Sequence, residues 1–257
     1  MPAVSPPFVP SFGNGVPGVA GRGQPPMYFD QGNGYALWVF KNGVWHQSSS
    51  GVIVPLAIVQ SAHGGLTFNG TNQVFPALAA NPTPGNLLVC MACVNTAAGS
   101  CPPASGYGID VYQTGAGSYG SFLAHKTAGA GEPKAQQPCA LDLGAGLIAG
   151  AVWELSGGSG LIDVIAHHEN YTGTISQPIT TTGPNGITLF YGSDFAVQSG
   201  SSWAVGGGLV SDGQDNVISR LQAAGHLVTA TATTYTPTVT PDTAGVNQSQ
   251  SICVNIR

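Results

Sequence analysis

Short runs of apolar residues alternate with polar, glycine-rich turns along most of this chain. Val, Ile, Thr and aromatic residues fill the runs, and Gly, Pro, Asn and Ser separate them. This spacing is typical of an all-β sandwich or barrel, because each short strand needs a turn at both ends. The expected strands are 55–61, 73–78, 86–95, 108–113, 121–126, 147–155, 161–168, 186–192, 203–209, 226–235 and 251–256.

Segment 27–47 differs from the rest in its density of aromatic residues. Within it, the run 35–40 is followed by Asn42-Gly43 and then by the run 44–47. Asn-Gly is the strongest two-residue hairpin signal, so we predict a β-hairpin module here. Because an isolated hairpin is only marginally stable, its aromatic side chains are expected to make attachment or oligomer contacts. These residues are Tyr28, Phe29, Tyr35, Trp38, Phe40 and Trp45.

Residues 1–26 are rich in proline and glycine. Proline interrupts helices and central strands, so this segment is predicted to be an extended attachment arm. The predicted organisation is an arm over 1–26, the hairpin module and a linker over 27–51, and an antiparallel β-sandwich over 52–257. A helical turn is expected at one place, residues 216–224.

The chain is poor in charge. Charged residues make up 7% of it, against about 25% in ordinary proteins. With 42% hydrophobic residues it does not have the composition of a disordered chain. Its 6 Lys and Arg residues cannot form a basic stripe, so nucleic acid is not an expected partner. No apolar stretch of about 20 residues is present, so membrane insertion is not expected.

Cysteine usage leaves two questions open. Cys90 and Cys93 form a C-x2-C pair that by itself suggests zinc or redox chemistry. Residues three apart on a strand point to opposite faces, which favours ordinary buried thiols instead. A disulfide between Cys101 and Cys139 is a further alternative.

The densest titratable cluster is His167-His168-Glu169. It could form a metal or acid-base site, but adjacent strand residues face opposite ways and no third ligand stands at a recognisable spacing. We interpret it as the surface end of a strand. No metal and no cofactor are expected.

Glu154 lies in an apolar run and has two interpretations. A buried carboxylate can be a catalytic acid, and a glycosidase would need a second carboxylate within about 10 Å of it. Alternatively, Glu154 hydrogen-bonds backbone or hydroxyl groups inside the sandwich, which is the interpretation we favour. We therefore expect no catalytic residue. Conceivable carboxylate partners are Asp110, Asp142, Asp163 and Asp194.

Some aromatic side chains of the larger unit could stack on sugar rings if they are exposed, because Tyr and Trp combine an apolar face with a polar group. The alternative is that they belong to the core or rim of the sandwich. The candidate glycan contacts are Tyr107, Tyr112, Tyr119, Tyr171 and Trp203.

Tyr28-Phe29-Asp30, Leu37-Trp38-Val39 and Asn42-Gly43-Val44-Trp45 resemble a short module of bacteriophage tail-fibre and virion proteins. The larger unit is similar to a jelly-roll-like β-sandwich of phage and bacterial surface proteins. The residues that carry this second resemblance are 58–62, 84–89 and 153–157. Cys90, Cys93 and the loop 96–106 depart from the pattern. The resemblance implies a structural role in a virion, often as a trimer that faces the host, and it carries over no catalytic residue.

The sequence thus favours a phage tail-fibre or receptor-binding protein, held by its arm to other virion proteins and displaying the sandwich on the particle surface. A homotrimer and contacts with host surface glycans are expected. One alternative is a capsid head-fibre or decoration protein. An alternative of another class is a polysaccharide-degrading enzyme on a β-sandwich.

Overall fold

A computed structural model describes most of the chain, which divides into two compact units, Met1–Pro55 and Leu56–Arg257. Each unit is described by itself. Among the described residues every regular element is a strand, and no helix there could span a membrane. The described residues are 27–30, 35–41, 44–47, 56–69, 72–94, 102–104, 106–114, 120–139, 147–158, 160, 162–171, 174–194, 202–216, 221–242 and 249–257.

The first unit contains an antiparallel sheet in the order β1-β2-β3. Its strands are β1 (Met27–Asp30), β2 (Tyr35–Lys41) and β3 (Val44–Gln47). Lys41 pairs with Val44, so Asn42-Gly43 is the two-residue connection that the sequence predicted. Strand β1 was not expected and adds a third strand to the hairpin. The arm 1–26 and the side chains of this unit lie outside what the structure describes.

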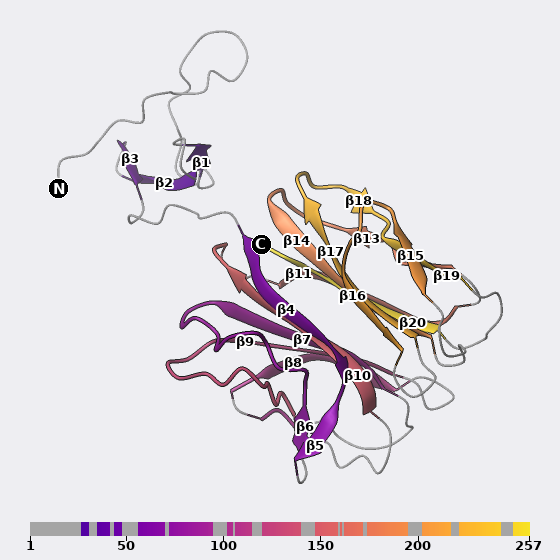
Figure 1. Ribbon diagram of the computed structural model, residues 1–257. Helices are drawn as coiled ribbons and strands as arrows, with labels where there is room; N and C mark the ends of the chain where they lie inside the picture. Colours follow the sequence, from indigo (N-terminus) through magenta and orange to yellow (C-terminus); the bar gives the residue numbers. More distant parts are fainter. Residues whose placement is uncertain are drawn as a thin grey trace. The chain divides into compact units, whose positions relative to one another are not determined.

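The second unit is built on two five-stranded antiparallel sheets (Figure 1). The first sheet has the order β4-β10-β7-β9-β8 and the second has the order β11-β20-β14-β17-β16. The first contains β4 (Ala57–Gly65), β7 (Leu87–Val94), β8 (Gly108–Thr114), β9 (Gly120–Thr127) and β10 (Leu147–Ser156). The second contains β11 (Ile162–Tyr171), β14 (Gly186–Asp194), β16 (Val210–Asn216), β17 (Leu221–Thr229) and β20 (Ser249–Ile256).

Shorter strands complete the second unit. β5 (Thr67–Asn69) and β6 (Asn72–Val74) form a hairpin. A three-stranded sheet has the order β12-β19-β15, from β12 (Ile175–Ser176), β15 (Trp203–Gly206) and β19 (Thr238–Pro241). β13 (Ile179–Thr180) pairs with β18 (Thr234–Tyr235).

Three apolar clusters hold these layers together. The central one joins the facing sides of the two large sheets and includes Trp153 and Leu155 from one and Tyr191 and Val254 from the other. Alternate residues of the same strands point outward, as the period of two requires. On the first sheet they pack beneath the segment of Phe75. The outer cluster of the second sheet includes residues of β12, β13, β15 and β19.

The all-β, antiparallel, sandwich-like class predicted from the sequence is confirmed. The helical turn expected at 216–224 is wrong where the structure describes it, because residues 221–224 belong to β17. Ala223 packs in the outer cluster of the second sheet and Ala224 in the central cluster, which is the alternation of a strand. Residues 217–220 lie outside the described residues.

Candidate functional site

Glu154, on β10, has a carboxylate that is fully enclosed, with 0% of the residue exposed. Its Oε1 accepts hydrogen bonds from the backbone N–H of Thr83 at 2.8 Å and from Nδ2 of Asn86 at 2.5 Å. Its Oε2 accepts one from Nε2 of Gln60. A bond from Ala80 N to Gln60 Oε1 at 3.0 Å fixes that amide in turn. The carboxylate therefore ties β10, β4 and the 80–86 segment together.

Two effects act on the pKa of Glu154. Burial, the larger single effect, raises it, but the hydrogen bonds from Gln60, Thr83 and Asn86 together outweigh burial and leave the pKa below its usual value. A catalytic acid needs a raised pKa near neutrality. The contacts thus agree with the structural interpretation of Glu154. Of the four suggested partners, Asp110 and Asp163 make other contacts, and the side chains of Asp142 and Asp194 lie outside the described residues.

Aspartate–histidine pairs connect the outermost strands of the large sheets to their neighbours. Nδ1 of His125, on β9, donates to Oδ2 of Asp110, on β8, at 2.5 Å. This hydrogen bond raises the pKa of the imidazole and outweighs the opposing effect of partial burial. Across the sandwich, Nδ1 of His63 on β4 is hydrogen-bonded to Oδ2 of Asp215 on β16. The sequence did not predict these pairs. His63 and Asp215 are far apart in the sequence, and Asp110 and His125 lie on two strands separated by a turn.

Asp212, on β16, has two partners from different sheets. Its Oδ1 accepts from Nδ1 of His226, on β17, at 2.7 Å, and its Oδ2 accepts from Nε1 of Trp153, on β10 of the first sheet, at 2.8 Å. The side chain of Asp212 is only 10% exposed. Together with His63 and Asp215, it links the two sheets along one side of the sandwich.

These pairs do not add up to a metal centre. Among the described residues no group of three or more His, Cys, Asp or Glu side chains could hold a metal ion. His167 lies on β11, and its Nδ1 is buried with no hydrogen-bond partner found within the described part of the chain. The side chains of His168 and Glu169 are not described, so the interpretation of this cluster stays a prediction.

A small polar cavity of about 280 Å³ lies beside the Lys126 side chain, and we call it the Lys126 cavity. Lys126 Nζ is 2.6 Å from Glu132 Oε1 and lies 4.4 Å from the ring centroid of Tyr107. The hydroxyl of Tyr107 donates to Gln136 Oε1 at 2.7 Å. Charged and amide groups line the opening, and those of Lys126, Glu132 and Gln136 already have partners within the chain. The lining residues are Lys126, Glu132, Pro133, Ala135, Gln136 and Gln137.

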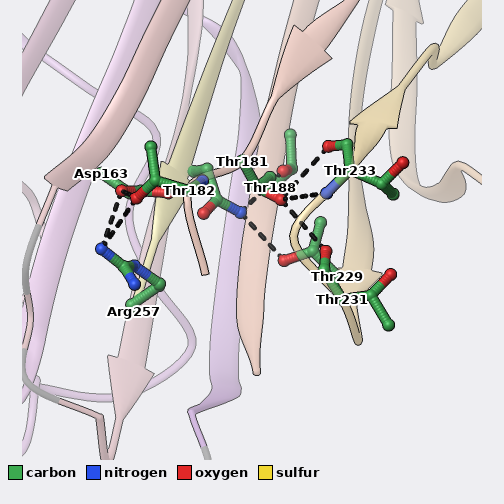
Figure 2. A network of polar contacts seen from close by, with 9 residues as sticks. Asp163, Thr181, Thr182, Thr188, Thr229, Thr231, Thr233 and Arg257 are labelled. Atoms are coloured by element: carbon green, nitrogen blue, oxygen red, sulfur yellow. Dashed lines mark hydrogen bonds and ion pairs between the residues drawn. The ribbon is translucent and has the colours of Figure 1, made fainter. Parts of the chain in front are cut away.

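A polar network at one end of the second sheet involves the C-terminal residue (Figure 2). Asp163 accepts from the backbone N–H of Thr182 and from Nη2 of Arg257, each at 2.8 Å. Burial alone would raise the pKa of Asp163, but these contacts together lower it. Nearby, Nδ2 of Asn255 donates to the hydroxyls of Thr188 and Thr229 at 2.9 and 3.0 Å. These hydrogen bonds connect neighbouring strands and the segments beside them, so we interpret the network as structural.

The expected glycan contacts are only partly placed by the structure. Tyr107 and Trp203 are 5% and 4% exposed, which agrees with the alternative that they belong to the core of the sandwich. Both fill apolar clusters on the outer faces of the large sheets. The side chains of Tyr112, Tyr119 and Tyr171 lie outside the described residues, as do those of Tyr28, Phe29, Tyr35, Trp38, Phe40 and Trp45.

The described cysteines are buried. Burial raises the pKa of the Cys90 thiol to about 12 and also raises that of Cys253. A buried thiol with a raised pKa is unreactive, because the nucleophile is the thiolate. This agrees with the prediction of an ordinary thiol at Cys90. Cys101 and the side chain of Cys93 are not described, so the suggested disulfide to Cys139 stays a prediction.

Comparison with known proteins identifies no relative. No family model, no curated protein and no solved structure matches this chain.

Proposed function

We propose that this chain is a structural protein of a bacteriophage particle, of tail-fibre or receptor-binding type. Its N-terminal arm attaches it to other virion proteins, and its β-sandwich is displayed toward the host surface. The observation that carries the proposal is the division into two units, in which the fibre-like motif occupies a small antiparallel sheet and a large β-sandwich follows. The low charge of the chain suits a subunit packed in an assembly.

The polar groups of the sandwich further support a display role. The carboxylates of Glu154, Asp163 and Asp212 all accept hydrogen bonds from other groups of the chain. Carboxylates arranged in this way hold strands in place. The jelly-roll connectivity implied by the resemblance is not part of the proposal, because each large sheet is formed by its own half of the chain.

Host contact by glycan binding belongs to the same proposal. With Tyr107 and Trp203 buried, we place the host contact at the Lys126 cavity, because its lining is polar. Binding of a host-surface polysaccharide to the full chain should weaken in the variant Gln137→Ala. It should not change in Lys134→Ala, whose exposed side chain lies outside the cavity lining. Equal binding by both variants would contradict this placement.

Oligomeric state tests the assembly proposal on the purified full chain. The molar mass of a trimer, measured by light scattering, should be three times the 25.9 kDa of one chain. Replacing aromatic residues of β2, as in Trp38→Ser with Phe40→Ser, should reduce the mass to one chain. The matched control is Val59→Ser, at an exposed valine of β4. A parent chain that is a monomer at all concentrations would contradict the trimer.

The enzyme alternative has its own experiment. A polysaccharide hydrolase shortens its polymer, and its activity should fall by orders of magnitude when the general acid is replaced. Shortening of a bacterial polysaccharide by the parent chain, lost in Glu154→Gln, would favour the enzyme and contradict the display role.

A further inference from the structure

The two large sheets have the same strand order. Numbering the five strands of each sheet along the chain, both sheets read first, fifth, second, fourth, third, and all neighbours are antiparallel. The first half, 56–158, forms one sheet, and the second half, 160–257, forms the other. The agreement also includes the register of the strands, their bulges and their turns.

The registers of the two sheets also correspond. At the start of the second strand, Leu87 pairs with Leu155 in the first sheet, and Ile187 pairs with Ile256 in the second. The same two residues pair on their other side with Thr127 and Val228. Equivalent positions can therefore be assigned residue by residue.

Irregularities of the sheets recur at equivalent positions. In the first strand the register skips Val59 in one half and Asp163 in the other. In the third strand it skips Asp110 and Asp212. A bulge is a specific local feature that re-aims a side chain, so two repeated bulges are strong evidence of a common pattern.

The aspartates at the second pair of bulges each pair with a histidine at an equivalent position. Asp110 pairs with His125, and Asp212 pairs with His226, an equivalent residue of the fourth strand. The chain has 6 histidines in 257 residues. Coincidence at both positions of a cross-strand pair is therefore improbable.

Turns recur as well. Gly85 and Asn185, just before the second strand, have left-handed φ values of 92° and 61°. Before the third strand, Tyr107 N bonds Ala104 O at 3.1 Å and Leu209 N bonds Gly206 O at 3.2 Å. Left-handed backbone is uncommon in a residue other than glycine, so Asn185 is notable for retaining it.

The central core is composed of equivalent pairs. Each buried position that the first sheet gives to it has a counterpart from the second sheet. Two sheets that face each other through equivalent residues are related by a twofold axis, as in an isologous dimer. The pairs are Leu87 and Ile187, Val89 and Leu189, Met91 and Tyr191, Leu123 and Ala224, Ala151 and Ile252, Trp153 and Val254, and Leu155 and Ile256.

The ends of the two halves meet. A Cβ atom placed on Gly158 would lie 2.8 Å from Leu56 Cδ1 and 3.1 Å from the carbonyl carbon of Arg257. The start of the first half, its end and the end of the second half are therefore neighbours, as a twofold arrangement of two consecutive units requires.

We infer that residues 56–257 are a tandem duplication of one five-stranded unit of about half that length. The inner face of each unit packs against the inner face of a second copy of the same unit, and both copies belong to this chain. The two halves are thus interchangeable in order. This inference is independent of the proposed virion role.

An order-exchanged chain tests it. The order would be 1–55, 160–257, a short glycine-serine linker and 56–158, which joins ends that already lie together. The matched control opens the first half at the exposed turn of Gly131 and has the order 1–55, 132–257, the same linker and 56–131.

The exchanged chain should unfold cooperatively with a Tm within about 10 °C of the parent, a shift of a few kcal/mol for this size. It should also keep the His125 titration of the parent by NMR. The control, which divides one unit, should be less stable than the exchanged chain. An exchanged chain that fails to fold, or that is no more stable than the control, would overturn the inference.

Discussion

Asp212, on β16 of the second sheet, accepts a hydrogen bond at 2.8 Å from Nε1 of Trp153, on β10 of the first sheet. Like the contact of His63 with Asp215, it is a polar contact between two layers whose facing sides pack through apolar residues. Trp153 is fully buried, so this carboxylate is the partner that keeps its indole N–H from being left unsatisfied.

Removing the carboxylate should therefore destabilise the sandwich. Asp212→Ala should lower the free energy of unfolding by about 2 kcal/mol, because it leaves a buried donor unpaired. In a double-mutant cycle with Trp153→Phe, the coupling should be about 0.5–3 kcal/mol. Urea unfolding measures both. Asp242→Ala, at an exposed residue bonded to Ser202, is the control and should change little. Additive effects of the first two changes would contradict the contact.

The lowered pKa of Glu154 predicts an acid dependence of stability. Its stabilisation is fully present above the pKa of an unfolded glutamate, about 4.3, and is lost as pH falls through the lower folded-state pKa. Glu154→Gln should cost about 2–3 kcal/mol at pH 7, since the bonds to a charged acceptor are lost. Unfolding curves at decreasing pH should show this difference shrinking toward pH 3. A difference that does not vary with pH would contradict the account.

The pair of Asp110 and His125 predicts a titration shift of the opposite sign. A raised folded-state pKa means that the stabilisation is present below the unfolded value of about 6.5 and is lost as pH rises through the folded pKa. In Asp110→Asn the pKa of His125 should fall, which NMR titration of the imidazole would show. Asp215→Asn, which alters the contact with His63, should leave His125 unchanged. Identical His125 titrations in the parent and Asp110→Asn would exclude the pair.

The close packing around Gly150, on the outer face of the first sheet, leaves no room for a side chain at this position. A Cβ at this position would lie 2.6 Å from Phe75 Cε1 and 2.8 Å from the carbonyl oxygen of Met91. Gly150→Ala should cost about 1–3 kcal/mol through overpacking. Gly108→Ala is the matched change on β8, where the nearest atom is 3.8 Å away, and it should be nearly neutral. Thermal unfolding of the two variants would decide, and equal Tm values would be evidence against this packing.

The apolar strands could be predicted from sequence because their own residues specify them. The runs around Leu88, Val152 and Phe190 are rich in β-branched and large apolar residues, and each forms a strand. Strand β16 was missed because its sequence, VSDGQDN, has no apolar alternation. Its aspartates bond His226 on the neighbouring strand β17 and His63 and Trp153 on the other sheet, so it is stabilised by tertiary contacts.

The candidate site was less predictable for the same reason. Glu154 could be singled out as a charge within an apolar run, but its partners at Gln60, Thr83 and Asn86 are distant in sequence. The two halves also escaped sequence analysis. Equivalent core positions hold different apolar residues, such as Met91 and Tyr191, which conserve burial without conserving identity.

The proposed display role can be tested most directly on bacteriophage particles purified from the source of this chain. An antibody raised against the full chain would be applied to purified particles and located by electron microscopy. The account predicts label on the outer surface, at the tail or the capsid, in a fixed number of positions per particle. Unlabelled particles, with the protein present only in the lysate of the host cell, would contradict it.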